Sequence, residues 1–302
     1  MSEPVVVLAG GTGGAKLARG MLDVVGSDLV VIANTGDDAE VHGGHVSPDP
    51  DLVTFWLADA IDARGWGIRD DTFSVMEALR GLGEDVWFNL GDRDLAICLA
   101  RARRLAEGER LTDCAAALCR AYGVPARVLP ASDDAVRTRV RAGGAWHDFQ
   151  DYMIRAGAPE PVQDVAFAGA ESAAPTPEVL EALRTARAIV IGPSNPVISI
   201  GPILALPGVR DALRDSPAPV VAVSPLVGGQ VLKGPTAAFM AWAGWSLDAA
   251  GIAAAYDGLL DGLVSDARTD ALPTLETDVA MPDAHARARL AEETLRFALA
   301  LG

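Results

Sequence analysis

The chain has 302 residues, 50% of them hydrophobic, and a formal net charge of −16 at pH 7. This length and apolar content suffice for a substantial core, in one large domain or two modest ones. Proteins that bind a nucleic-acid backbone normally display a basic stripe, so the negative charge argues against such a partner. An anionic ligand must therefore be held locally, by backbone N–H groups, a few cations or a metal ion.

The N-terminal segment and the apolar stretches do not predict a membrane protein. The segment before residue 4 lacks the basic region of a signal peptide, and a strand follows at once. The longest apolar stretch, residues 236–256, is interrupted by Gly244 and Asp248, which indicates two short helices rather than a membrane span. Three cysteines without metal-ligand spacing are typical of a reducing compartment. We expect a cytoplasmic protein.

A βαβ unit opens the chain. Residues 4–10 (PVVVLAG) form a continuous apolar run, as expected for a strand buried on both faces of a parallel sheet. Residues 14–26 follow with helical spacing, and Gly26 stands where a helix would end. A second buried strand begins at residue 29 and runs into the sequence NTGDD. The right-handed crossover rule makes the two strands parallel.

Similar strands recur at residues 187–195 and 218–229, with a helix, a turn and another helix between them. Ligands of open α/β sheets collect beyond the carboxyl ends of the strands. Four strand ends therefore face one crevice: GGTGG, NTGDD, GPSNP and SPLVGG. We predict an α/β fold with a Rossmann-like, doubly wound and mostly parallel sheet.

The middle of the chain differs from this pattern. Residues 53–122 are predicted to be mostly helical, whereas residues 126–168 hold alternating segments between GG and AP turns and predict antiparallel strands. Residues 282–301 predict an amphipathic closing helix. We therefore expect a single catalytic domain over residues 1–302, with a smaller β-rich insertion at approximately residues 125–170.

The glycine-rich turn after the first strand, AGGTGGAK, indicates a phosphate or nucleotide site. Glycine there lets backbone N–H groups approach phosphate oxygens at a positive helix N-terminus. The dinucleotide fingerprint would place a third glycine at position 16, which is Lys16, and the P-loop pattern fails too. This argues against an NAD-dependent oxidoreductase. A tight turn with a purely structural role is the alternative.

The acid-rich segment after the second strand suggests a metal site. A zinc site would recruit His42 and His45, but their spacing across two glycines fixes no common face and no cysteine is near. Magnesium takes a few carboxylates and relies on substrate phosphates. Asp37 or Asp38 at a strand end, with Asp51 across the loop, suits magnesium better.

Two further segments offer polar groups. Ser194, Asn195 and Ser199 lie among prolines on a rigid loop, and such short neutral donors suit a diphosphate or a nucleobase edge, although a generic turn would look the same. Asp49 begins the segment DPDLVTFWL, where an acid stabilises a helix N-terminus. Asp49 is either a helix cap and nothing else or a member of the acid cluster, and it is not among the expected site residues.

In combination these motifs resemble the 2-phospho-L-lactate transferase (CofD/FbiA) family over roughly residues 4–235. Several of them run eight or more residues, which makes the resemblance specific. In chain order they are GGTGGAKLARG, NTGDD, HGGHVSPDPD, GWGIRDDTF, WFNLGDRDLA, LPASDDAVRTRV, HDFQDY, GPSNPVISIGPIL and SPLVGG.

The resemblance implies a transferase of coenzyme F-420 biosynthesis that acts on substituted phosphate groups. Its acceptor would be Fo, a hydroxylated deazaflavin with a ribityl chain. Its donor would be a guanosine diphospho compound of lactate, phosphoenolpyruvate or 3-phosphoglycerate. The terminal ribityl hydroxyl attacks the phosphorus that bears the organic acid, and GMP leaves. Magnesium is the cofactor expected from the family, and a homodimer is the expected assembly.

Site residues carry over by motif. The resemblance places magnesium at Asp37 and Asp51, with Asp38 as support or base, and it places Arg93 and His147 toward the acceptor or the transferred group. From the residues alone, Arg93 pairs either internally or with a phosphate, and His147 is either an acid or base or an ordinary strand residue. Expected substrate-binding residues are Gly10, Gly11, Thr12, Gly13, Gly14, Lys16, Asn34, Ser194, Asn195 and Ser199.

A second function uses the same glycine-rich turn. The YvcK-type gluconeogenesis factors are similar in fold, and a member of that kind would be a non-catalytic nucleotide-binding regulator without an acceptor pocket. Saturable binding of Fo distinguishes the transferase from the regulator.

Overall fold

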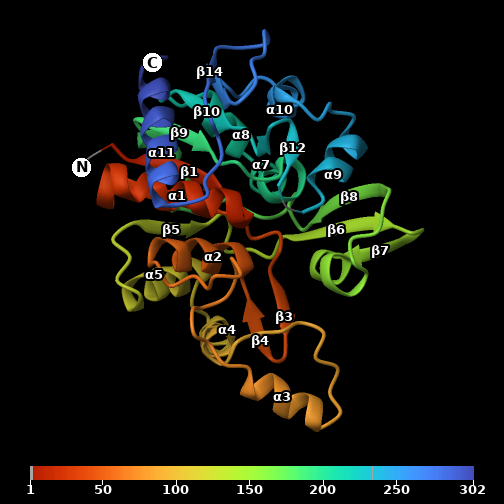
Figure 1. Ribbon diagram of the computed structural model, residues 1–302. Helices are drawn as coiled ribbons and strands as arrows, with labels where there is room; N and C mark the ends of the chain where they lie inside the picture. The colour runs from red at the N-terminus through yellow and green to blue at the C-terminus, as the bar shows by residue number, and fades with distance from the viewer. Residues whose placement is uncertain (1–2, 233) are drawn as a thin grey trace.

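Seven parallel strands form the central sheet of the computed structural model, which describes residues 3–232 and 234–302 (Figure 1). The strand order is β14-β13-β10-β9-β1-β2-β5, so the first strand of the chain lies in the middle of the sheet. The bounds are β1 Val5–Ala9, β2 Leu29–Ala33, β5 Arg127–Pro130, β9 Ala188–Ile191, β10 Val220–Val223, β13 Gly262–Ser265 and β14 Thr274–Glu276. The predicted parallel α/β sheet is confirmed.

Helices cover both faces of this sheet because its central strands are apolar on both sides. Every residue of β1, β2, β9 and β10 is buried. On one face, Leu17 and Met21 of α1 pack with Leu290 of the closing helix, α11. The helices of this face are α1 Gly11–Val25, α2 Pro48–Leu57, α5 Leu111–Ala121 and α11 Ala284–Leu299. Helix α1 ends, as predicted, at Gly26, whose φ is 57°.

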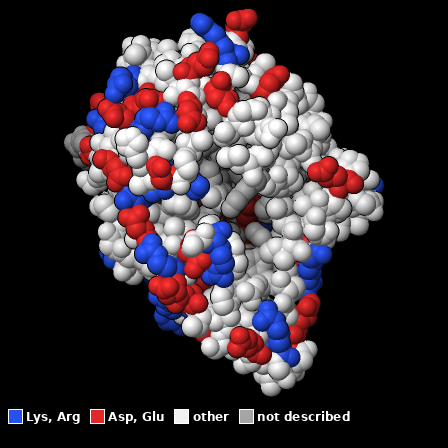
Figure 2. Space-filling view, in the orientation of Figure 1, with Lys and Arg blue, Asp and Glu red and all other residues white. Residues whose placement is uncertain are grey.

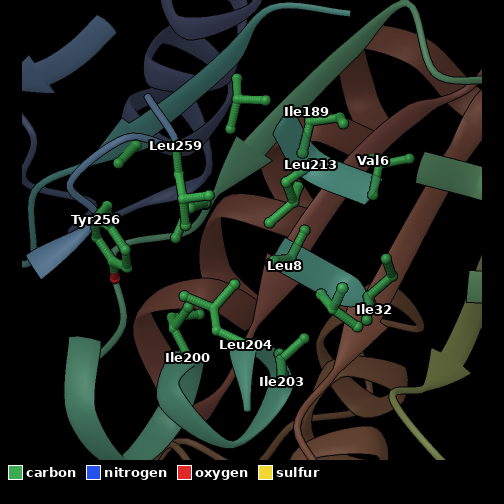
Figure 3. Close-up of a cluster of buried hydrophobic side chains, with 14 of the residues drawn as sticks. Val6, Leu8, Ile32, Ile189, Ile200, Ile203, Leu204, Leu213, Tyr256 and Leu259 are labelled. Carbon is green, nitrogen blue, oxygen red and sulfur yellow. The ribbon is translucent and has the colours of Figure 1, made fainter. Parts of the chain in front are cut away.

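The opposite face carries a second apolar layer. Figure 3 shows Val6, Leu8 and Ile32 of the sheet directed toward Ile203 and Leu213 of the helices that cover them. These helices are α6 Pro177–Thr185, α7 Gly201–Leu204, α8 Val209–Arg214 and α10 Ala249–Ala255. The sheet is therefore doubly wound, and the ends of its strands are held between two packed layers.

The insertion is a separate three-stranded antiparallel sheet of β6 Arg137–Ala142, β7 Ala145–Asp148 and β8 Val162–Ala168. Its predicted start was wrong. Residues 127–130 pair in parallel with β2 at the edge of the central sheet, because Val128 and Leu129 are buried there against neighbouring helices. Residues 151–155, predicted as part of a strand, form a short π-helical turn, η2.

The segment between β2 and β5 projects from the sheet (Figure 1). It holds the hairpin β3 Ala39–Val41 and β4 Gly44–Val46, and the helices α3 Ser74–Gly81 and α4 Asp92–Ala106. Helix α4 lies beside β4 and α5, and α3 lies beside α4. Residues 58–73 and 82–91 of the predicted helical region are not helical. Further along, residues 236–256 form α9 Thr236–Ala243 and α10, as predicted. Within the described part of the chain, no helix is long and apolar enough to cross a membrane.

Candidate active site at the strand ends

The ends of β1, β2 and β9 converge, as the sequence predicted. The backbone N–H of Asn34 donates to the carbonyl of Ala9 at 3.0 Å, and Gly192 donates to Leu8 at 2.9 Å. The loops that follow these strands therefore lie against each other. Figure 2 shows a hollow in the middle of the side of the molecule that faces the viewer, with atoms of acidic residues at its bottom.

The glycine-rich turn is packed tightly against the loop after β9. A Cβ at Gly10 would lie 2.7 Å from Ser199 Cβ, one at Gly14 would lie 2.7 Å from Ser194 Oγ, and one at Gly13 would overlap the carbonyl oxygen of Pro193. Gly10 also donates its N–H to Ser194 Oγ at 3.4 Å. The structure thus brings Ser194 and Ser199 to the turn, and close packing alone already requires glycine at these positions.

Asp49 was not among the site residues expected from the sequence. Its side chain lies at the N-terminus of α1. Its Oδ1 accepts the Gly11 N–H at 2.6 Å, and its Oδ2 accepts from Asn34 Nδ2 at 2.9 Å. A carboxylate is favoured at this position because the free N–H groups of a helix start carry positive potential. Burial raises the pKa of Asp49 to about 6, against the lowering effect of these two hydrogen bonds.

Asp37 has a carboxylate oxygen that accepts no hydrogen bond from the described residues. The residue is 9% exposed, and this oxygen, Oδ1, is buried. Burial, and then the nearby carboxylate of Asp49, raise the pKa of Asp37 well above its ordinary value. The insertion reaches the same residue, since Gln150 Nε2 donates to the Asp37 carbonyl at 3.2 Å.

Asp38, by contrast, is fully engaged. Ser47 Oγ donates to its Oδ1 at 2.8 Å, and His45 Nε2 lies 3.1 Å from its Oδ2. The second nitrogen of His45 lies 3.2 Å from Glu40. This network fixes the base of the β3–β4 hairpin, and both carboxylate oxygens of Asp38 have partners within the protein.

Within the part of the protein that the structure describes, Asp51, unlike Asp37, has a charged partner. It forms a buried ion pair with Arg101, whose Nη1 also donates to the His45 carbonyl at 2.9 Å. Asp94 and Cys98 of α4 complete the cluster, in which ligand atoms of Asp51, Asp94 and Cys98 lie within 4.8 Å of one another. Burial raises the pKa of Asp94 to about 7. The two residues predicted to share a magnesium ion therefore differ in their direct partners, although the charge of Asp38 acts on both.

Three other predicted site residues contact other parts of the protein. Lys16 Nζ donates to the Met281 carbonyl at 3.3 Å, and Arg93 donates to the Arg69 carbonyl on an exposed surface. His147 Nε2 lies 3.3 Å from the carbonyl of Ala142 on the paired strand of its own hairpin. Their predicted roles stay predictions.

Asn195 and Thr12 complete the predicted set. The Asn195 side chain caps the π-helical turn η3 (Pro196–Ile200) by accepting from the N–H groups of Val197 and Ile198 at 2.9 and 3.2 Å. Thr12 is half-buried in the first turn of α1. Asn195 therefore shapes the loop beside the glycine-rich turn, and its own polar atoms are largely used within the protein.

Comparison with known proteins agrees with this architecture. The sequence profile described as "2-phospho-L-lactate transferase CofD" matches residues 5–296. A "Phosphoenolpyruvate transferase" of Streptomyces griseus subsp. griseus is 41% identical, over 96% of this chain and 98% of its own. A "2-phospho-L-lactate transferase" of Methanosarcina mazei is 39% identical, over 87% of each chain. A UPF0052-family protein from Bacillus halodurans is similar in fold, with a TM-score of 0.65, 18% identity and coverage of 98% of this chain and 99% of its own.

Proposed function

The chain belongs to the CofD family of 2-phospho-L-lactate transferases, and we propose that it joins a phospho-organic-acid group to the deazaflavin Fo. The donor is a guanosine diphospho compound, and the product is a phosphodiester precursor of coenzyme F-420. In this reaction the terminal ribityl oxygen forms a bond to the phosphorus that bears the acid. The bond from that phosphorus to GMP breaks, and the hydroxyl proton is released.

The observation that carries the proposal is the pair of buried carboxylates, Asp37 and Asp49, at the ends of β2 and α1. Magnesium favours carboxylate oxygens, and the unpartnered Oδ1 of Asp37 beside Asp49 fits such a hard cation. When bound, the ion supplies charge neutralisation for the diphosphate of the donor. Asp37 would hold it, and Asp51, which is paired with Arg101, would contribute only if that pair opened.

The remaining residues of the cluster orient Asp37. Asn34 links Asp49 to the backbone of Gly36, because its Nδ2 donates to Asp49 and its Oδ1 accepts the Gly36 N–H at 2.8 Å. Gln150 holds the carbonyl of Asp37 from the side of the insertion. A site with its carboxylates fixed before substrate arrives needs little reorganisation during the reaction, which is the principal source of electrostatic catalysis.

Two expectations from the sequence belong to the same proposal. We place the reaction in the cytoplasm, and we expect a homodimer. The identity of the three-carbon acid is the open part of the substrate, since relatives named for enolpyruvate and for lactate are similar to this chain to almost the same degree.

A reaction with a mixture of the three candidate donors tests the proposal. Purified protein, Fo and the donors are incubated with magnesium, and products are identified by mass spectrometry. We expect one Fo phosphodiester and an equal amount of GMP, with neither formed when a chelator replaces magnesium. Fo fluorescence is titrated in parallel. Absence of both GMP release and saturable Fo binding would favour the non-catalytic regulator.

A further inference from the structure

A cavity lies beside the η3–α7 segment, whose residues Pro196, Val197, Gly201 and Leu204 form part of its wall. Its volume is about 200 Å³. Three aromatic side chains line it, Phe167 of β8, Trp242 of α9 and Trp245 after α9, and one charged side chain does so, Arg210 of α8. Figure 1 shows α7, α8, α9 and β8 around this region. The walls thus combine flat apolar surface with a single cation.

Arg210 has no anionic partner in the described part of the chain. Neither a hydrogen bond nor an ion pair of its side chain occurs there, and the charged group that acts on it most is another cation, Arg214. Burial, and then Arg214, lower the pKa of Arg210, although an arginine stays charged. In a protein of net charge −16, a partly buried arginine without an acid beside it leaves its guanidinium available to an anion from outside.

The shape of the cavity limits what this anion is. A cavity of about 150 Å³ accommodates benzene, so about 200 Å³ admits one aromatic ring with a short substituent. Gly201 leaves room for the Phe167 ring, because a Cβ there would lie 2.9 Å from Phe167 Cζ. One guanidinium matches the two oxygens of a single carboxylate in a bidentate contact. A dianion would be left half-neutralised inside a strongly acidic protein.

We propose that this cavity binds a small aromatic carboxylate, with the ring between Phe167 and the two tryptophans and the carboxylate on Arg210. The site is distinct from the strand-end cluster and does not depend on the transferase reaction. It adjoins the cluster structurally, because Pro196 and Val197 form part of its wall and directly follow Asn195.

Calorimetric titration with 3-phenylpropionate, and with its neutral amide as the matched ligand, tests the proposal. We expect the carboxylate to bind at least about tenfold more tightly than the amide, as a charge-assisted pair is worth 1.5–3 kcal/mol. Arg210→Gln should remove this preference and leave amide binding unchanged. Arg214→Gln, in an exposed residue outside the cavity lining, should leave both affinities within about twofold.

Three outcomes would overturn the proposal. One is the absence of saturable binding of the carboxylate, and another is an equal affinity for the amide in the unaltered protein. The third is displacement of the bound carboxylate by Fo, which would make the cavity part of the acceptor site. Fo turnover by Arg210→Gln should stay within about twofold of the parent, so a fold defect would be recognised separately.

Discussion

Asp49 Oδ1 accepts a hydrogen bond from the backbone N–H of Gly11 at 2.6 Å, across 38 positions of sequence. The positive end of α1, where the glycine-rich turn predicted a phosphate, is therefore already occupied by a carboxylate of the protein. This contact ties the turn to α2 and brings Asp49 next to Asp37. The glycine-rich turn is therefore part of an acidic cluster. The roles of the residues in this cluster can be tested by substitution.

Asp37→Asn should separate activity from stability. Losing the free carboxylate should lower turnover at least about a hundredfold, as for other preorganised electrostatic groups. The same change should raise the melting temperature at pH 8 in a chelator, because a carboxyl whose pKa is raised on folding opposes folding at high pH. Asp270→Asn, in an exposed loop, is the control and should change neither quantity. Full turnover by Asp37→Asn would refute its role.

The glycine-rich turn should tolerate no side chain at Gly13. An added methyl group would overlap the Pro193 carbonyl and push the two loops apart, so Gly13→Ala should cost about 1–3 kcal/mol of unfolding free energy. Gly81→Ala is the matched control. It lies in α3 with open space around it, and alanine there should be neutral or stabilise by up to about 1 kcal/mol. Urea denaturation measures both, and equal effects would contradict the packing argument.

The buried pair of Asp51 and Arg101 should matter chiefly for folding. Arg101→Met leaves an uncompensated carboxylate in the core and should cost about 3–5 kcal/mol. Arg103→Met on the exposed side of the same helix should change stability by less than about 0.5 kcal/mol. Magnesium titration of Asp51→Asn provides a separate readout. Unchanged magnesium affinity is expected, and its loss would restore Asp51 as a ligand.

Stability should fall as the pH rises from 5 to 8. The pKa of Asp49 is raised to about 6 and that of Asp94 to about 7, from an ordinary value of 3.8. The folded protein therefore binds more protons than the unfolded chain in this range, which makes the slope of unfolding free energy against pH negative. Asp94→Asn should reduce the loss of unfolding free energy between pH 5 and pH 8 by on the order of 2 kcal/mol. Chelator-treated protein is followed by thermal melts, and a rising slope would contradict the assignment.

Much of the fold was readable from the sequence because buried parallel strands are continuous apolar runs. Val5–Ala9 and Leu29–Ala33 were recognised in this way, and Gly26 marked the end of α1. Residues 127–130 were misassigned for a physical reason: the strand is short, begins with an exposed arginine, and precedes alternating segments that belong to another sheet. The local sequence pattern of a strand does not indicate which of two sheets the strand joins.

The site was only partly readable, because its decisive contacts are long-range. The acid at position 49 looked like an ordinary helix-start residue, and nothing near it in sequence indicates Gly11 as its partner. The pairing of Asp51 with Arg101 spans 50 positions, and arginine spacing along α4 does not reveal which arginine is buried. The residue types predicted a cluster of carboxylates that could hold a cation. Only the folded structure shows which of these carboxylates are free and which are paired.

The central position of β1 has a consequence for how the protein is made. This strand is synthesised before the other six strands of the central sheet, yet one of its two partners, β9, ends only at residue 191. Until then the nascent chain carries a fully apolar strand with one open edge, which is a template for wrong pairing. Chaperone dependence during synthesis should therefore be a property of this chain, and moving β1 to the C-terminus by circular permutation should reduce it.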